Sequence, residues 1–249
     1  MPIPMTIANP KSFLHGLFGN GHYPEEESIV MIDYHFTLED GEVLSFSIDL
    51  NRIYTPEIDA APHPDWTRLT HCQCEHCPLT AKTHQHCPAA VDLEEILKLF
   101  SNRISYQNVS VRVVTPEREY LKNCDIQTGL NSLIGLVMAT SACPIISQLG
   151  SLAKTHLPFS TAEETIYRVV SAYLLRQYFL AQEGNEPDFE LKGLDALYQE
   201  LSLLNQSFIL RIREISNADA NLNAIVRLYC VSIMLLSSLE DQLGVCHKP

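Results

Sequence analysis

Hydrophobic and polar residues alternate along two neighbouring segments near the beginning of the chain. Residues 32–38 carry a hydrophobic side chain at every second position, and residues 44–50 continue the same period after a short break. Successive side chains of a strand point to opposite faces, so each segment has the pattern of a strand with one buried face. The break contains Asp40-Gly41, a pair typical of tight turns between antiparallel strands. The sequence therefore predicts a β-hairpin.

Residues 109–114 (VSVRVV) predict a further strand, because β-branched side chains favour extended backbone. This strand is expected to end at Thr115-Pro116, where the proline removes a backbone donor. The predicted strands make a small antiparallel sheet of about three strands, and one face of it needs a covering layer.

The second half of the chain has the periodicity of helices, with apolar residues three or four positions apart. One helix is expected to open at Ser160 with a capping box, in which Glu163 occupies the third helical position. Gly244 is the expected C-cap residue of the last helix. The predicted helices cover residues 92–102, 127–140, 145–156, a segment from Ser160 onward, 191–216 and 219–243.

These patterns predict an α+β fold, in which a small N-terminal antiparallel β-sheet with a cysteine-rich metal loop is followed by a C-terminal helical bundle. We expect a flexible N-terminal arm at residues 1–27, which are rich in Pro, Gly and His. The sheet and the metal loop are assigned to residues 28–123 and the bundle to residues 124–249. The two larger parts are expected to pack as one compact unit.

Residues 51–91 show neither period and contain several of the chain's fourteen prolines. A long irregular stretch inside a compact domain needs something other than a hydrophobic core to organise it. Its residues 71–87 read HCQCEHCPLTAKTHQHC, so eight of these seventeen residues are Cys or His. Thiolate and imidazole are the ligands that zinc and softer metals prefer. The segment therefore predicts a metal site.

Cys74 and Cys77 have the spacing of a metal knuckle, and Cys87 is near enough in sequence to reach the same ion. Two residues are candidates for the fourth ligand. Cys72 would complete a local site, because alternate residues of an extended segment point to the same side. Cys143 would complete a long-range site. A proline directly follows Cys143, as it does Cys77 and Cys87. We therefore place this long-range site slightly ahead of the local one.

Zinc is the expected metal, since it accepts four cysteines in a closed tetrahedral site. An iron–sulfur cluster uses the same residues and also tolerates a proline after cysteine. The spacing does not separate the two cofactors. The nearby histidines also permit a looser site that would sample several metals, as a sensor or a buffer does.

The charge and the apolar runs limit the classes of partner. The net charge is −13, with 17 Lys and Arg scattered among 30 Asp and Glu, so nucleic-acid binding is not expected. The longest apolar runs, such as residues 133–139, fall well short of the 18 residues that span a bilayer. The first twenty residues lack the pattern of a secretory signal. We expect no membrane association and a cytoplasmic location.

No phosphate-binding loop, nucleophile elbow or His-Glu-x-x-His motif is present in the sequence, and no catalytic residue is predicted. The segment HLPFSTAEETIYRVVSAYLLRQYF (residues 156–179), together with the Cys-Pro elements, resembles an uncharacterised bacterial family of unknown function. That resemblance implies no activity.

The leading functional hypothesis is a non-enzymatic, zinc-stabilised adaptor or regulatory module whose bundle meets a protein partner or a second copy of the chain. One alternative is a redox or metal sensor with an iron–sulfur cluster or a labile metal. The other is a zinc enzyme with an open coordination position, which requires that Cys74, Cys77 and Cys87 are the only protein ligands.

Overall fold

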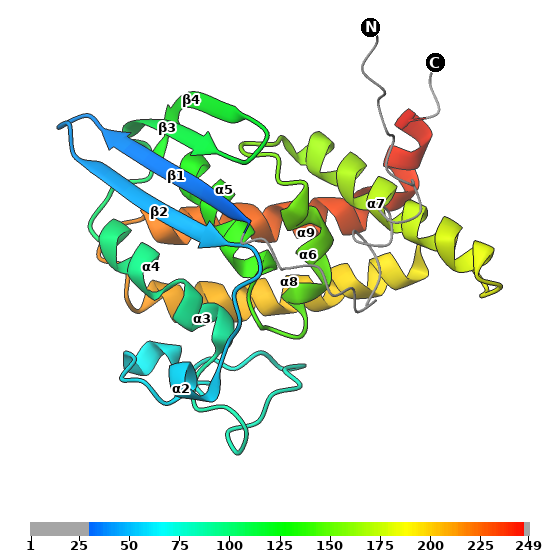
Figure 1. Ribbon diagram of the computed structural model, residues 1–249, viewed down its shortest axis with the longest axis horizontal. Helices are drawn as coiled ribbons and strands as arrows, with labels where there is room; N and C mark the ends of the chain where they lie inside the picture. Colours follow the sequence, from blue (N-terminus) through cyan, green and yellow to red (C-terminus); the bar gives the residue numbers. More distant parts are fainter. Residues whose placement is uncertain (1–29, 247–249) are drawn as a thin grey trace, which may run out of the picture.

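The computed structural model describes the backbone of residues 30–246 and the side chains of residues 30–237 (Figure 1). The predicted arm at residues 1–27 lies outside this range. Four antiparallel strands form one sheet in the order β2-β1-β3-β4. They are β1 (Met31–Leu38), β2 (Val43–Asp49), β3 (Asn108–Val114) and β4 (Glu119–Asp125). The predicted α+β class is confirmed.

The hairpin and the third strand lie where the alternation predicts them. Gly41 has φ +86° in the turn, a conformation that favours glycine. Tyr34 pairs with Phe46 of β2 on one side and with Val113 of β3 on the other, and all three side chains are buried. The register therefore brings the apolar positions of three strands onto one face. β4 was not predicted and most of its side chains are exposed or half-buried.

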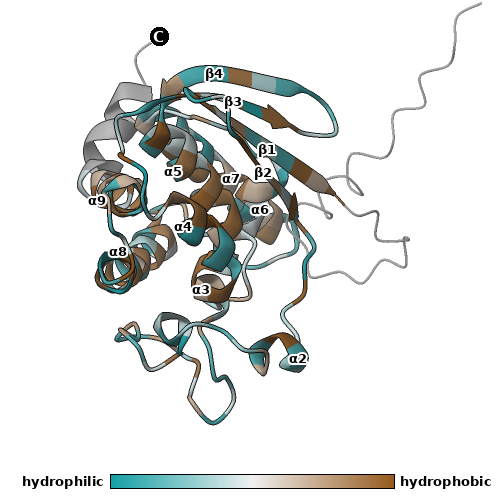
Figure 2. Cartoon of the chain, turned by 90° about the vertical axis from the view of Figure 1, so that its left-hand side faces the viewer, coloured by the Kyte–Doolittle hydropathy of each residue, from teal (hydrophilic) through white to brown (hydrophobic). Residues whose placement is uncertain are grey.

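Helix α5 (Ile126–Ala139) covers the apolar face of the sheet. It begins at Asp125, whose carboxylate accepts the N–H of Thr128 at 2.9 Å. Gly129 faces the sheet, and a Cβ atom there would lie only 2.8 Å from both Phe36 and Val111. The absence of a side chain at this position allows the close approach of the helix to the strands. α5 thus forms the middle layer, between the sheet and α9 (Ala220–Cys246) (Figure 2).

The remaining helices follow the predicted order with shifted boundaries. α7 (Ala162–Gln182) begins one residue later than predicted, because its capping box uses Thr161 and Glu164 rather than Ser160 and Glu163. The predicted helix at 145–156 consists of a 3₁₀ turn, η2 (Ile146–Leu149), followed by α6 (Gly150–Lys154). α8 (Lys192–Arg213) packs along α9, which continues through Gly244 instead of ending there.

One hydrophobic core joins the sheet and the helices, and it includes Tyr34 of β1, Leu133 of α5, Phe208 of α8 and Ile225 of α9. Residues Ala220–Ser237 of α9 are long and apolar enough to cross a membrane by length and composition. The core helix of a soluble protein passes the same test, and α9 packs against α5 and α8. The expectation of no membrane association stays a prediction.

The irregular segment lies at the end of the molecule away from the sheet, below α3 and α8 (Figures 1 and 2). It contains α2 (Pro56–Asp59) and the 3₁₀ turn η1 (Asp65–Thr67), and it leads into α3 (Pro88–Asp92) and α4 (Glu94–Phe100). Arg68 and His86 form an isolated antiparallel bridge that draws its two limbs together. This segment carries the cysteine cluster.

Candidate metal centre

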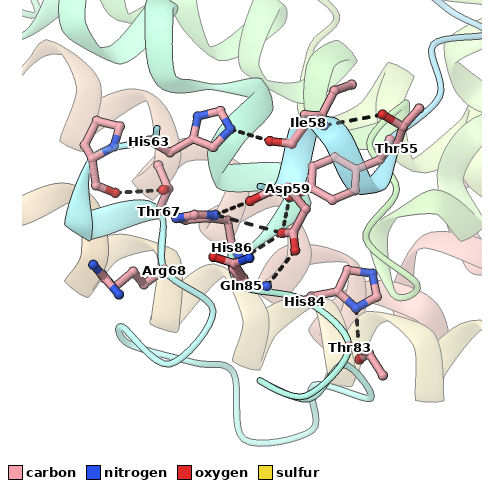
Figure 3. Close-up of polar contacts among 12 residues, drawn as sticks. Thr55, Ile58, Asp59, His63, Thr67, Arg68, Thr83, His84, Gln85 and His86 are labelled. Carbon is pink, nitrogen blue, oxygen red and sulfur yellow. Dashed lines mark hydrogen bonds and ion pairs between the residues drawn. The ribbon is translucent and has the colours of Figure 1, made fainter. Parts of the chain in front are cut away.

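Asp59 organises the irregular segment through polar contacts that the sequence analysis did not predict. Its buried carboxylate accepts the N–H groups of Gln85 and His86 at 2.7 and 2.9 Å and the hydroxyl of Tyr54 at 2.7 Å (Figure 3). The His86 ring in turn donates from Nδ1 to the Asp59 carbonyl at 2.8 Å. Burial alone would raise the pKa of Asp59, but these donors outweigh it, so the pKa lies below its ordinary value.

This cluster positions the segment just before Cys87. The N–H of Cys87 donates to the carbonyl of Thr67 at 2.8 Å, and Cys87 then serves as the N-cap residue of α3 with Pro88 at the first helical position. The Cys87 side chain is buried, and the N–H of Ala90 donates to the Cys87 carbonyl at 2.9 Å. A polar scaffold therefore fixes one cysteine without any metal.

Cys74 and Cys77 form the predicted tight turn, in which the N–H of Cys77 donates to the carbonyl of Cys74 at 3.0 Å. Both side chains pack against the hydrophobic core. The hydroxyl of Ser207, on α8, lies near Cys74 and acts to lower the pKa of its thiol.

Cys143 lies between α5 and η2 and is buried. The N–H groups of Ile145 and Ile146 act to lower the pKa of its thiol, as the N–H of Ala90 does for Cys87. A proline directly follows each of these two cysteines, and the N–H groups that affect the thiol lie two or three residues after it.

The structure brings Cys74, Cys77, Cys87 and Cys143 into one neighbourhood. Burial raises the pKa of the Cys74 thiol to about 12, and the nearby Cys87, Cys143 and Cys77 raise it further. Burial likewise raises the pKa of Cys87 to about 11, where Arg211 acts in the opposite direction and Cys143 and Cys77 act in the same one. Burial is also the main cause of the raised pKa of Cys143, and Cys77 contributes to it.

Arg211 of α8 lies beside this neighbourhood and is 2% exposed. Its Nη1 donates to the carbonyls of Trp66 and Arg68, and its Nε–H has no hydrogen-bond partner among the described residues. No described carboxylate forms an ion pair with it. A buried guanidinium normally has a negative partner, because removing a charge from water costs several kcal/mol. Near Arg211, the groups that can become negative are the cysteine thiols, which gain a negative charge when they lose their protons.

Cys72 lies in a different group. One ligand atom each from Cys72, His71 and Glu214 are all within 4.8 Å of one another, and the His71 Nε2 and a Glu214 carboxylate oxygen are 3.0 Å apart. Cys72 itself has φ +44°, in the left-handed region that residues with a Cβ seldom occupy. The structure thus separates the two candidates for the fourth ligand, with Cys143 beside the other three cysteines and Cys72 beside a histidine and a glutamate.

The four thiols are less compact than that second group, because within the described chain they do not form a set with all sulfurs inside 4.8 Å. In a closed tetrahedral zinc site the sulfurs are about 3.8 Å apart, from a Zn–S bond of about 2.3 Å. Binding one ion therefore requires the side chains to move inward.

A family model described as a domain of unknown function (DUF6901) matches residues 32–248 of the chain. The chain belongs to this family. The match begins in β1 and reaches past α9, so the sheet, the cysteine loop and the helices all belong to the DUF6901 domain. It agrees with the resemblance to an uncharacterised family. No curated protein and no solved structure matches the chain.

Two residues of the DUF6901 domain near the cysteines were missed from the sequence, Ser207 and Arg211 of α8. Arg211 follows Phe208 by three positions and Ser207 precedes Arg211 by four, so both lie on one side of the helix. The sequence feature that could have pointed to them is a charged residue next to the apolar stripe of α8.

Proposed function

We propose that the protein binds one zinc ion through Cys74, Cys77, Cys87 and Cys143, and that this ion fastens the irregular segment to the helices. The observation that carries the proposal is Arg211, a buried cation without a described carboxylate partner, which lies near Cys87 in the neighbourhood of the four cysteines. A zinc ion with four thiolates has a net charge of about −2, which would offset this guanidinium.

The polar groups next to the thiols support the same proposal. The N–H groups of Ala90, Ile145 and Ile146 and the Ser207 hydroxyl act to lower the pKa of the nearby thiols, although burial raises it overall. Polar groups of this kind stabilise a thiolate more than a neutral thiol, which favours ligation over a set of unligated cysteines.

The proposed site has a structural role rather than a catalytic one. Four protein ligands leave no open position for water or substrate. The ligands come from the turn at Cys74–Cys77, the start of α3 and the α5–η2 connection, so one ion would join three separated parts of the chain. The adaptor or regulatory role of the whole protein is a separate hypothesis, which this site does not test.

Metal analysis of the purified full chain tests the proposal. We expect about one zinc per chain, a colourless protein, and a lower melting temperature after treatment with a chelator. A brown protein that contains iron and sulfide would instead support the iron–sulfur cluster. A chain that takes up no metal under reducing conditions would overturn the proposal.

A further inference from the structure

A cavity of about 190 Å³ lies among the helices and does not include any of the four cysteines. Most of its wall is apolar, with contributions such as Leu136 of α5, Leu149 of η2, Leu201 of α8 and Leu228 of α9. Three larger polar side chains reach the same cavity, His156, Arg168 and Tyr198. Ligand sites are typically built this way, as an apolar pocket with a few polar groups that fix orientation.

Tyr198 is 4% exposed, lines the cavity, and its hydroxyl makes no hydrogen bond to any described residue. Part of the hydroxyl surface stays accessible, so a molecule in the cavity can hydrogen-bond to it. Burial also raises the pKa of this phenol, which keeps it neutral and available as a donor. The position therefore favours a ligand that accepts a hydrogen bond.

Arg168 supplies a positive charge at the wall of the cavity. Its Nη2 donates to the carbonyls of Leu152 and Thr155, while its Nε and Nη1 have no hydrogen bond to a described residue. Glu164, one turn earlier on α7, uses its carboxylate in the capping box at Thr161. No described residue forms an ion pair with Arg168, although burial already lowers its pKa by penalising the charged form.

His156 brings no second positive charge. Its Nε2 lies 2.5 Å from the hydroxyl of Tyr34, which also bonds to Ser132 at 2.8 Å. Burial, assisted by the nearby Arg168, lowers the pKa of His156 to about 3, so the ring is neutral. The cavity thus has one cation, one free hydroxyl and an apolar body.

We propose that this cavity binds a small organic carboxylate with an apolar body. The carboxylate would accept from the free nitrogens of Arg168 and from the Tyr198 hydroxyl, and the apolar part would fill the space between α5, α8 and α9. An apolar cavity of about 150 Å³ accommodates benzene, so this one suits a ring or a short alkyl chain with a head group. A single arginine in an apolar wall matches a monoanion better than a phosphate dianion, which needs more donors.

The proposal is independent of the zinc site, and its test uses different readouts. Calorimetric titration of the full chain with benzoate and hexanoate is compared with titration using benzyl alcohol and hexanol. We expect saturable binding of the carboxylates with a Kd below about 1 mM and at least tenfold weaker binding of the alcohols. Equal binding of acids and alcohols, or no binding of either, overturns the proposal.

Two variants locate the head group. Arg168→Gln is expected to weaken carboxylate binding at least about tenfold and to leave alcohol binding unchanged. Arg176→Gln, an exposed position on the same helix, is the matched control and should bind as the natural chain does.

Because Arg168 also bonds to the end of α6, its replacement has a structural cost, and Tyr198→Phe provides the second variant. It keeps the ring and is expected to weaken carboxylate binding about three- to tenfold, with an unchanged circular dichroism spectrum. Unaltered carboxylate affinity in both variants contradicts the proposal.

Discussion

The guanidinium of Arg211 and the thiol of Cys87 lie close enough for the arginine to lower the pKa of the cysteine, although burial raises it overall. Arg211 is on the C-terminal half of α8 and Cys87 is at the start of α3. This arrangement places a fixed positive charge inside the protein, near groups that become negative only when they lose their protons. The sign of the effect of Arg211 on stability then depends on whether a metal is bound.

Arg211→Met is expected to affect the metal-loaded and metal-free proteins in opposite ways. In the loaded protein it removes the partner of a negative centre and should lower the free energy of unfolding by about 3 kcal/mol. In the metal-free protein it removes an uncompensated buried charge and should be neutral or stabilising. Urea unfolding of both forms measures the difference. Arg213→Met, at an exposed position two residues on, is the control.

Equal destabilisation of the two forms by Arg211→Met would mean that the arginine acts only through the carbonyls of Trp66 and Arg68.

The fourth ligand is tested by the pair Cys143→Ser and Cys72→Ser. Cys143→Ser should lose most of the bound zinc, because serine is a far weaker ligand than thiolate and the site would keep three sulfurs. Cys72→Ser should retain about one zinc per chain, since Cys72 lies with His71 and Glu214. Elemental analysis after gel filtration reads out both. Zinc loss in Cys72→Ser with retention in Cys143→Ser would reverse the assignment.

Gly129→Ala tests the close approach of α5 to the sheet. The added Cβ would lie 2.8 Å from side-chain atoms of Phe36 and Val111. The free-energy cost of this overpacking should exceed the gain of about 1 kcal/mol from the higher helix propensity of alanine. We expect the free energy of unfolding to decrease by about 1–2 kcal/mol.

The matched control for that substitution is Gly135→Ala on the same helix, where the nearest atom would be 3.5 Å away. This change should be neutral or stabilising by up to about 1 kcal/mol. Similar effects at the two glycines would show that α5 adjusts its distance from the sheet.

Buried His156 makes stability depend on pH. Its pKa is about 3 in the folded protein and about 6.5 when unfolded, so between these values only the unfolded state binds a proton. Stability contributed by the neutral ring is present above pH 6.5 and falls as the pH drops toward 3, by about 2 kcal/mol between pH 7.5 and 5.

His156→Gln should remove this component, so that urea unfolding of the variant depends less steeply on pH than that of the natural chain. Identical pH slopes in the two proteins would mean that the ring is protonated in the folded state or neutral in both.

The fold was largely predictable because its periodic elements bury one face. β1, β2 and β3 alternate cleanly, and the helices carry apolar stripes. β4 was missed because an edge strand with little buried surface has no reason to alternate. The start of α7 was displaced by one residue because Ser160-Glu163 and Thr161-Glu164 both have the spacing of a capping box.

The candidate site was predictable in its cysteines but not in its supports. Density and the Cys-Pro pairs slightly favoured these four cysteines over the set with Cys72, and the fold places the four in one neighbourhood. Asp59 gave no signal, since a lone aspartate in an irregular segment looks like a turn residue, and its acceptor role depends on backbone groups 26 and 27 positions later. Those contacts help to order residues 51–91 in addition to any metal.

The exposed strand β4 also has a consequence for solubility. β3 contains VSVRVV, a run with high β-propensity and a single charge, and the outer edge of such a strand would offer unpaired N–H and C=O groups to another chain. β4 covers that edge along its whole length and presents Glu119, Lys122 and Asp125 in its place. A strand that contributes little to the core thereby protects a strand with high β-propensity from pairing with another chain.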